Sequence, residues 1–201
     1  MGVTSKYARY HGNNQEANVN NVARFGEPAH SLYTSAKIFT LHKQIDITDD
    51  QEQLVYRSRS KMISIKDKTE IIDAAGKTVA NIERKVFTIH EKHIITMADG
   101  DTFTLSTELL HLVKDVINIP DLGWQIRGNL FQVNFEIYDS DGSVLAVIGR
   151  KMISIHEKFC IDIYKPEKEG EIIAVLVALE HMIQDREQRQ SSSSSYSSSS
   201  N

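Results

Sequence analysis

Cysteine is nearly absent from this 201-residue chain, in which Cys160 is the one cysteine. A single thiol excludes an intramolecular disulfide and a zinc site made of several cysteines, so we expect a reducing compartment. The N-terminal residues contain no apolar run of the kind that forms a secretory signal peptide. These absences together predict a cytoplasmic protein.

Excess positive charge and catalytic motifs are also missing. The 23 Lys and Arg residues are outnumbered by 27 Asp and Glu residues, and the net charge of −4 argues against a nucleic-acid-binding protein. The sequence has no GxSxG motif, Walker loop or GxGxxG motif. His90 and His93 have a spacing that could hold a metal on a helix, but here they fall across a predicted turn. We therefore expect no catalytic site, no metal site and no cofactor.

No apolar run is long enough to cross a bilayer, which takes about 20 residues. The strongest run has eight consecutive apolar residues, Ile172 to Leu179, and Glu180 and His181 follow it directly. Strong helix formers come next, so the segment predicts a helix over 171–189 that the rest of the fold encloses. A membrane-inserted segment is the alternative. In the enclosed helix, the residues predicted to face the core are Ile172, Ile173, Leu176, Leu179 and Ile183.

An internal repeat occupies the middle of the chain. Residues 73–95 align without gaps onto residues 139–161, with 11 of 23 positions identical, and shorter echoes begin at Lys37 and Lys61. Each copy has two alternating apolar stretches around a polar turn, which is typical of a β-hairpin. The second strand of each hairpin carries one recurring isoleucine: Ile47, Ile71, Ile95 or Ile161.

The whole pattern predicts a mainly β fold of ten to twelve short antiparallel strands. A sheet of this size tends to close, and a closed barrel has an interior that the apolar helix can fill. Leu109, Leu112, Val113 and Val116 follow helical spacing and predict a short connecting helix. We expect a flexible extension at 1–31, the barrel at 32–189 and a disordered serine-rich tail at 190–201.

The repeated hairpins KVFTIHEKH and KMISIHEKF resemble the LURP-one-related family, as does the segment LGWQIRGNLFQVNFEIYDSDGSVLAVIGRKMISI. The resemblance covers about Tyr33 to Asp185. It implies the tubby C-terminal-like fold that this family shares with tubby proteins and phospholipid scramblases. In that fold a closed antiparallel barrel of about twelve strands encloses a hydrophobic C-terminal helix. Membership does not by itself assign a function, because one fold hosts several.

Basic residues recur where the predicted hairpins begin. Arg57, Arg59 and Lys61 alternate on one face of a strand, and the pairs Arg84–Lys85 and Arg150–Lys151 take the equivalent place in later hairpins. Their functional interpretation is a site for anionic phospholipid headgroups, as the resemblance to tubby proteins suggests. The alternative is a solvated rim that protects strand edges.

These observations predict a non-enzymatic binding or scaffold module. We expect peripheral association with anionic lipid or with a membrane-associated protein, and no nucleic-acid partner. Two alternatives stay open. One is a scramblase-like membrane protein with its C-terminal helix inserted, and the other is a protein-interaction module with no lipid role.

Overall fold

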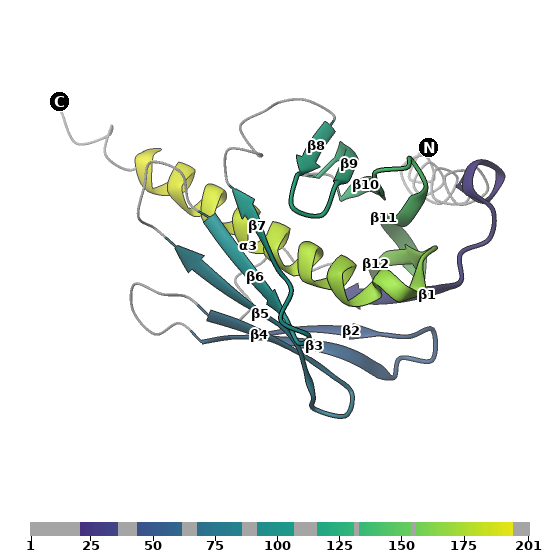
Figure 1. The fold of residues 1–201 in the computed structure, drawn as a ribbon, viewed down its shortest axis with the longest axis horizontal. Helices are drawn as coiled ribbons and strands as arrows, with labels where there is room; N and C mark the ends of the chain where they lie inside the picture. Colours follow the sequence, from purple (N-terminus) through teal and green to yellow (C-terminus); the bar gives the residue numbers. More distant parts are fainter. Residues whose placement is uncertain are drawn as a thin grey trace, which may run out of the picture.

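The computed structural model describes residues 21–35, 44–61, 68–85, 92–106, 116–130, 133–153 and 156–194. In these residues one antiparallel sheet of twelve strands curls into a nearly closed barrel around a helix (Figure 1). The expected fold class is therefore confirmed. The strands are β1 His30–Ser35, β2 Gln44–Thr48, β3 Leu54–Lys61, β4 Lys68–Asp73, β5 Thr78–Lys85, β6 Lys92–Met97, β7 Thr102–Ser106, β8 Val116–Ile119, β9 Trp124–Asn129, β10 Asn134–Tyr138, β11 Val144–Ile153 and β12 His156–Ile163.

The strands are amphipathic because alternate side chains of an extended chain point to opposite faces. In β2, Ile45 and Ile47 are buried while Gln44 and Asp46 are exposed. The isoleucines that recur with the repeat all point into the core and are at most 3% exposed. The isoleucine that recurs in the second strand of each hairpin therefore marks the inner face of that strand.

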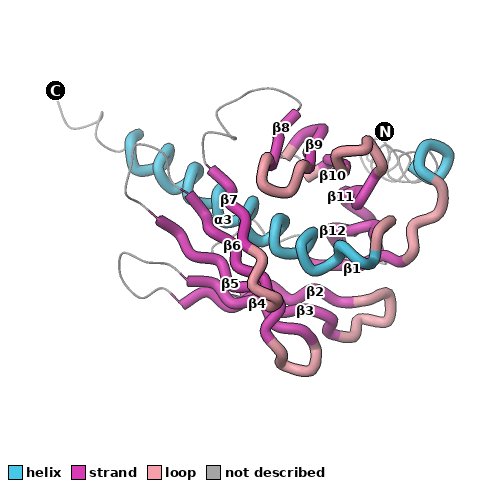
Figure 2. Tube along the Cα trace, in the orientation of Figure 1, coloured by secondary structure: helices cyan, strands magenta, loops and turns pink. Residues whose placement is uncertain are grey.

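The helix α3 (Glu169–Ser194) runs through the barrel after a short 3-10 turn, η1 (Pro166–Lys168) (Figure 2). Glu169 begins it and accepts a hydrogen bond of 2.7 Å from the Tyr56 hydroxyl, and an acid is favoured at this positive end of a helix. The helix continues to Ser194, so it extends into the serine-rich segment that the sequence assigned to a disordered tail.

The enclosed position of α3 agrees with its sequence. Ile172 and Ile173 are 0% exposed, and Leu179 and Ile183 are 2% exposed. Leu176 is the exception, because it is only partly buried and packs against the edge of the core. Leu176 still packs against the hydrophobic core, and it also lines a cavity that is described below.

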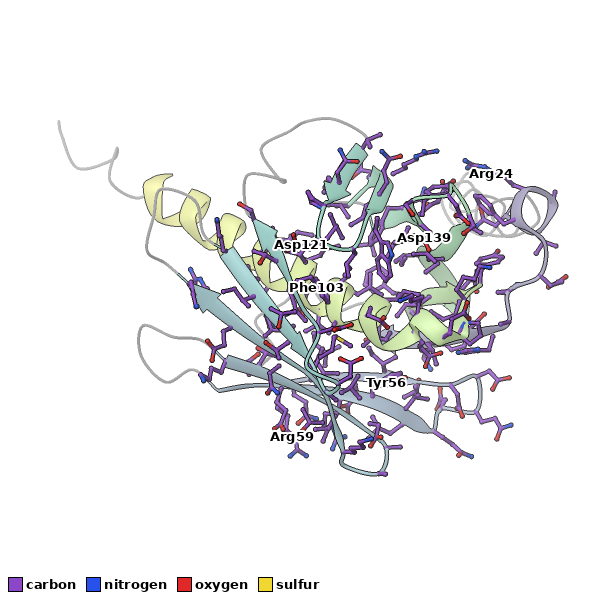
Figure 3. The ribbon with its side chains drawn as sticks, viewed as in Figure 1. Arg24, Tyr56, Arg59, Phe103, Asp121 and Asp139 are labelled. Atoms are coloured by element: carbon purple, nitrogen blue, oxygen red, sulfur yellow. The ribbon has the colours of Figure 1, made fainter. Side chains whose placement is uncertain are left out.

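The barrel has one seam, between the edge strands β7 and β8. The backbone N–H of Thr104 in β7 donates a hydrogen bond of 2.8 Å to Oδ2 of Asp121, which lies in the turn after β8 (Figure 3). Val116, expected at the end of a helix, is in β8, where the β-branched sequence Val-Ile-Asn-Ile favours a strand. The rest of that expected helix, 107–115, lies outside the described residues.

The first described residues are attached to the outside of the barrel. Residues 21–25 are helical, and Arg24 forms an ion pair of 2.6 Å with Glu136 and a hydrogen bond of 3.1 Å with the Tyr138 hydroxyl. Strand β1 begins at His30 and pairs with β12. The barrel therefore starts two residues before the boundary expected from the sequence.

All neighbouring strands are antiparallel, so the chain reverses direction at each step around the sheet. As a result β3, β5 and β11 all finish at the same end of the barrel, and β4, β6 and β12 begin there. We call this the hairpin-tip end. Helix α3 extends towards the same end, since His181 contacts Ser60 near the end of β3. None of the helices in the described ranges is long and apolar enough to cross a membrane.

Candidate functional site

Three hairpins carry a pair of lysines in direct cross-strand register at the hairpin-tip end. Like charges that face each other across two strands destabilise a sheet, so the recurrence of this arrangement needs an explanation. We call these six residues the lysine rim. They are Lys61 opposite Lys68, Lys85 opposite Lys92, and Lys151 opposite Lys158.

Two of the rim lysines whose side chains the structure describes form ion pairs with acids. Lys68 forms an ion pair of 2.5 Å with Glu83, and Lys158 forms one of 2.6 Å with Glu52. Lys85 and Lys92 are both exposed, and neither has an ion pair with an acid in the described part of the chain. The β5–β6 hairpin therefore presents two adjacent positive charges to solvent.

The basic ladder predicted on β3 lies on the outer face of the barrel. Ser58, between its two arginines, is buried, so Arg57 and Arg59 point outward (Figure 3). Arg57 binds Asp46 through two hydrogen bonds of 2.6 and 2.8 Å, and these hydrogen bonds lower the pKa of Asp46. Arg59 pairs in register with Glu70 on β4. The structure thus gives a ladder of alternating charge at this position. Lys61 follows in the same strand and pairs in register with Lys68, and its side chain lies outside what the structure describes.

Arg84 is separated from the other predicted residues because it faces the opposite side of its strand. It is half-buried and lies across from His93, which is 1% exposed, while its neighbour Lys85 is exposed on the outer face. In β11, Arg150 pairs in register with Phe159 and Lys151 with Lys158, and the side chains of Arg150 and Lys151 lie outside what the structure describes.

A buried polar cluster lies inside the barrel below the rim. The rings of His93 and His181 are 6.4 Å apart, and Nε2 of His181 is 3.4 Å from the Ser60 hydroxyl, which in turn bonds Thr69 at 2.8 Å. Burial, together with the charges of His181 and Arg84, lowers the pKa of His93 to about 3. His93 is therefore neutral at physiological pH.

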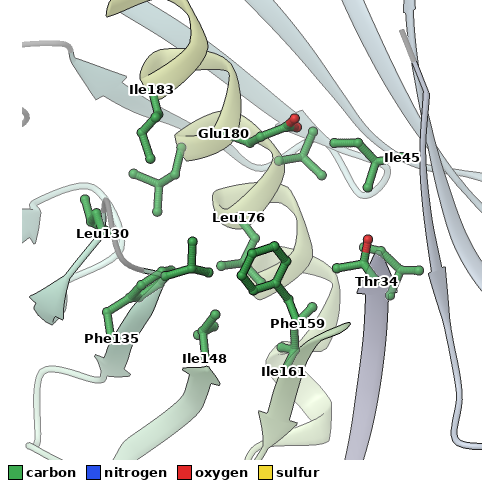
Figure 4. A pocket seen from close by; sticks show the side chains of 14 residues that line it. Thr34, Ile45, Leu130, Phe135, Ile148, Phe159, Ile161, Leu176, Glu180 and Ile183 are labelled. Atoms are coloured by element: carbon green, nitrogen blue, oxygen red, sulfur yellow. The ribbon is translucent and has the colours of Figure 1, made fainter. Parts of the chain in front are cut away.

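Glu180 is the second buried titratable group on this part of α3, and it is 2% exposed. Burial raises its pKa to about 9, so its carboxyl group is protonated at neutral pH. The side chain lines a cavity of about 50 Å³ between α3 and the sheet (Figure 4). Among the described residues of that lining, Thr34 is the other polar one.

Sequence reasoning missed Lys68, Lys92 and Lys158 as members of the rim. A signal was present, because each lies seven residues after the lysine that it faces. That spacing becomes cross-strand pairing only when the hairpin register is known. Among the described residues, no group of three or more His, Cys, Asp or Glu side chains is placed to hold a metal ion.

The fold and the site define a class of protein: an antiparallel barrel built around its own C-terminal helix, with a basic rim at one end. The model of the LURP-one-related family matches residues 30–180, and the chain belongs to that family. It is similar to the uncharacterized protein YxjI of Bacillus subtilis, with 24% identity over 156 residues that cover 78% of this chain and 95% of the relative. It is also similar to the crystal structure of an Arabidopsis thaliana protein, with 14% identity, a TM-score of 0.48, and coverage of 77% of this chain and 92% of the other.

Proposed function

We propose that this protein is a non-enzymatic binding module that associates peripherally with anionic lipid surfaces at its hairpin-tip end. One observation carries the proposal: lysines face each other in three hairpins that end on the same side of the barrel. Facing lysines repel each other and weaken the sheet, and a bound anion that contacts both lysines relieves this repulsion. The repeat thus provides several equivalent contacts to one surface.

Burial and ion pairing favour some of the predicted basic residues over others for this proposed contact. Arg57 is neutralised by Asp46 and Arg84 faces the interior, so we assign neither to the lipid contact. Lys85 and Lys92 are the strongest candidates because both are exposed and no described acid pairs with them. Arg59 is exposed on the same outer face and extends the basic surface along β3, and the side chain of Lys61 lies outside what the structure describes.

The test is flotation of the purified protein with vesicles of phosphatidylcholine alone, or of phosphatidylcholine mixed with phosphatidylserine or a phosphoinositide. Each lysine near an anionic surface contributes about 1 kcal/mol, so Lys85→Gln/Lys92→Gln should weaken binding by about 30-fold. Binding should also fall steeply as salt shortens the screening length to about 3 Å at 1 M.

The matched control removes two lysines from the opposite end of the barrel. Lys77 lies in the turn between β4 and β5, and Lys165 follows β12, so Lys77→Gln/Lys165→Gln changes the net charge equally. This variant should bind almost as the unmodified protein does. If both double variants lost the same amount of vesicle binding, the binding would depend on net charge alone, and the proposed contact at the hairpin-tip end would be wrong. Absence of binding to every anionic vesicle would refute the proposal and favour a protein partner.

A further inference from the structure

Helix α3 lies off-centre in the barrel. It packs closely against β5, β6 and β7, and a Cβ added at Gly170 would be in van der Waals contact with Val79 at 3.4 Å and with Met97 at 3.5 Å. On the other side, a cavity of about 50 Å³ separates the helix from the wall formed by β1, β2, β10, β11 and β12. The fold therefore has one tightly packed wall and one wall with unfilled space.

The lining of this cavity selects for hydrocarbon. Aliphatic or aromatic side chains form nearly all of it, and Figure 4 shows Leu176, Phe159 and Phe135 around the space. Thr34 and Glu180 contribute the polar groups. The volume would admit a water molecule beside these two polar groups, but the rest of the lining offers it no hydrogen bond, and apolar space of this kind takes up small apolar molecules.

Charge further restricts the occupant. The Glu180 carboxyl group is buried and kept protonated, so it meets a ligand as a neutral group that can donate or accept a hydrogen bond. A carboxylate ligand would lose its hydration in this site, and no cation among the described lining residues would replace it. An ammonium ligand would have to ionise Glu180 at the same time. Size also limits the ligand, since a cavity of about 150 Å³ holds benzene and this one is about a third as large.

We infer that this cavity is a binding site for a small uncharged molecule that has a short hydrocarbon part and one hydroxyl or carbonyl group. The hydrocarbon lies between α3 and the β10–β12 wall, and the polar group lies beside Glu180. Because the lysine rim is on the outer face, this site does not depend on the lipid contact proposed above.

The experiment is methyl NMR of the full chain titrated with 1-propanol, propionate or propylammonium, which share a three-carbon chain and differ in charge. Saturable shifts are expected with 1-propanol at lining methyl groups such as those of Ile45, Ile148 and Ile161. The two ions should bind at least about tenfold more weakly. No saturable shift with 1-propanol, or equal binding of propionate, would overturn the inference.

Three variants locate the site. Leu176→Phe fills the cavity from a partly buried position and should abolish the shifts, whereas Leu122→Phe enlarges another partly buried leucine of the core that does not line the cavity. Glu180→Gln keeps a neutral polar group and should retain binding. Retained binding in Leu176→Phe would place the ligand elsewhere and refute the assignment. The charge comparison needs no variant, so it decides the question even if a variant fails to fold.

Discussion

Replacing Glu180 by glutamine is expected to make the barrel more stable at neutral pH. Glutamine has nearly the same size and, like the protonated carboxyl group, is neutral. The pKa of Glu180 is about 9 in the folded protein and about 4.5 in the unfolded chain. Between these values the unfolded chain has released the proton and the folded protein has kept it, so stability falls as the pH rises.

The magnitude follows from the two pKa values. One pH unit within this window corresponds to about 1.4 kcal/mol, so from pH 4.5 to pH 7 the unmodified protein loses about 3 kcal/mol through this group alone. Glu180→Gln does not titrate and should be more stable by about that amount at pH 7. At pH 4.5 the two proteins should have nearly equal free energies of unfolding.

Urea unfolding followed by circular dichroism, at steps from pH 6.5 to 8.5, is the appropriate assay. His93 does not interfere in this range. Its folded pKa of about 3 lies below its unfolded value of 6.5, so the stability that it contributes is complete above pH 6.5 and is lost only as the pH falls. The difference between the two proteins should grow with pH. Parallel curves, or a less stable glutamine variant at pH 8, would refute the assignment of a protonated buried carboxyl group.

Two further substitutions test the fold, each with its own control. Val175→Asp should unfold the domain, because Val175 is 0% exposed and an unpaired polar group there costs several kcal/mol. The control, Leu176→Asp, changes the neighbouring, partly exposed position and should cost less. Equal midpoints of thermal unfolding for the two variants would contradict the enclosed helix. Gly128→Ala should destabilise the folded protein by about 1–3 kcal/mol, because φ is +116° and the added Cβ would lie 2.6 Å from a backbone carbonyl oxygen. The control, Gly149→Ala, adds its Cβ in open space and should cost less. Similar losses of unfolding free energy in urea for the two variants would contradict the backbone geometry.

The architecture was readable from the sequence because two signals agreed. Alternation predicted the hairpin strands, whose recurring isoleucines prove to be buried, and the short apolar run predicted the helix that fills the interior. Val116 was misassigned because its spacing from preceding leucines fits a helix equally well, and pairing with β9 decides in favour of a strand.

The candidate site was harder to predict from the sequence, because it depends on the register of strand pairing and on how deeply each side chain is buried. Arg84 and Lys85 are neighbours in sequence, yet they face opposite sides of β5. The partner of Arg57 is Asp46, which is eleven residues earlier and becomes adjacent only through β2–β3 pairing. The burial of Glu180 depends on how α3 is rotated inside the barrel, and an apolar run with one acid in it does not fix that rotation.

Paramagnetic relaxation by vesicles tests the central claim most directly, because it reports which end of the barrel faces the membrane. Anionic vesicles that carry a gadolinium-chelating lipid are added to isotope-labelled protein, and the loss of each amide signal is measured. We predict the greatest loss at Lys68, Lys85 and Lys92, at the hairpin-tip end, and little loss at Gly76 and Gly142, in turns at the opposite end. Equal loss at both ends, or greater loss at Gly76 and Gly142, would contradict a membrane contact through the lysine rim.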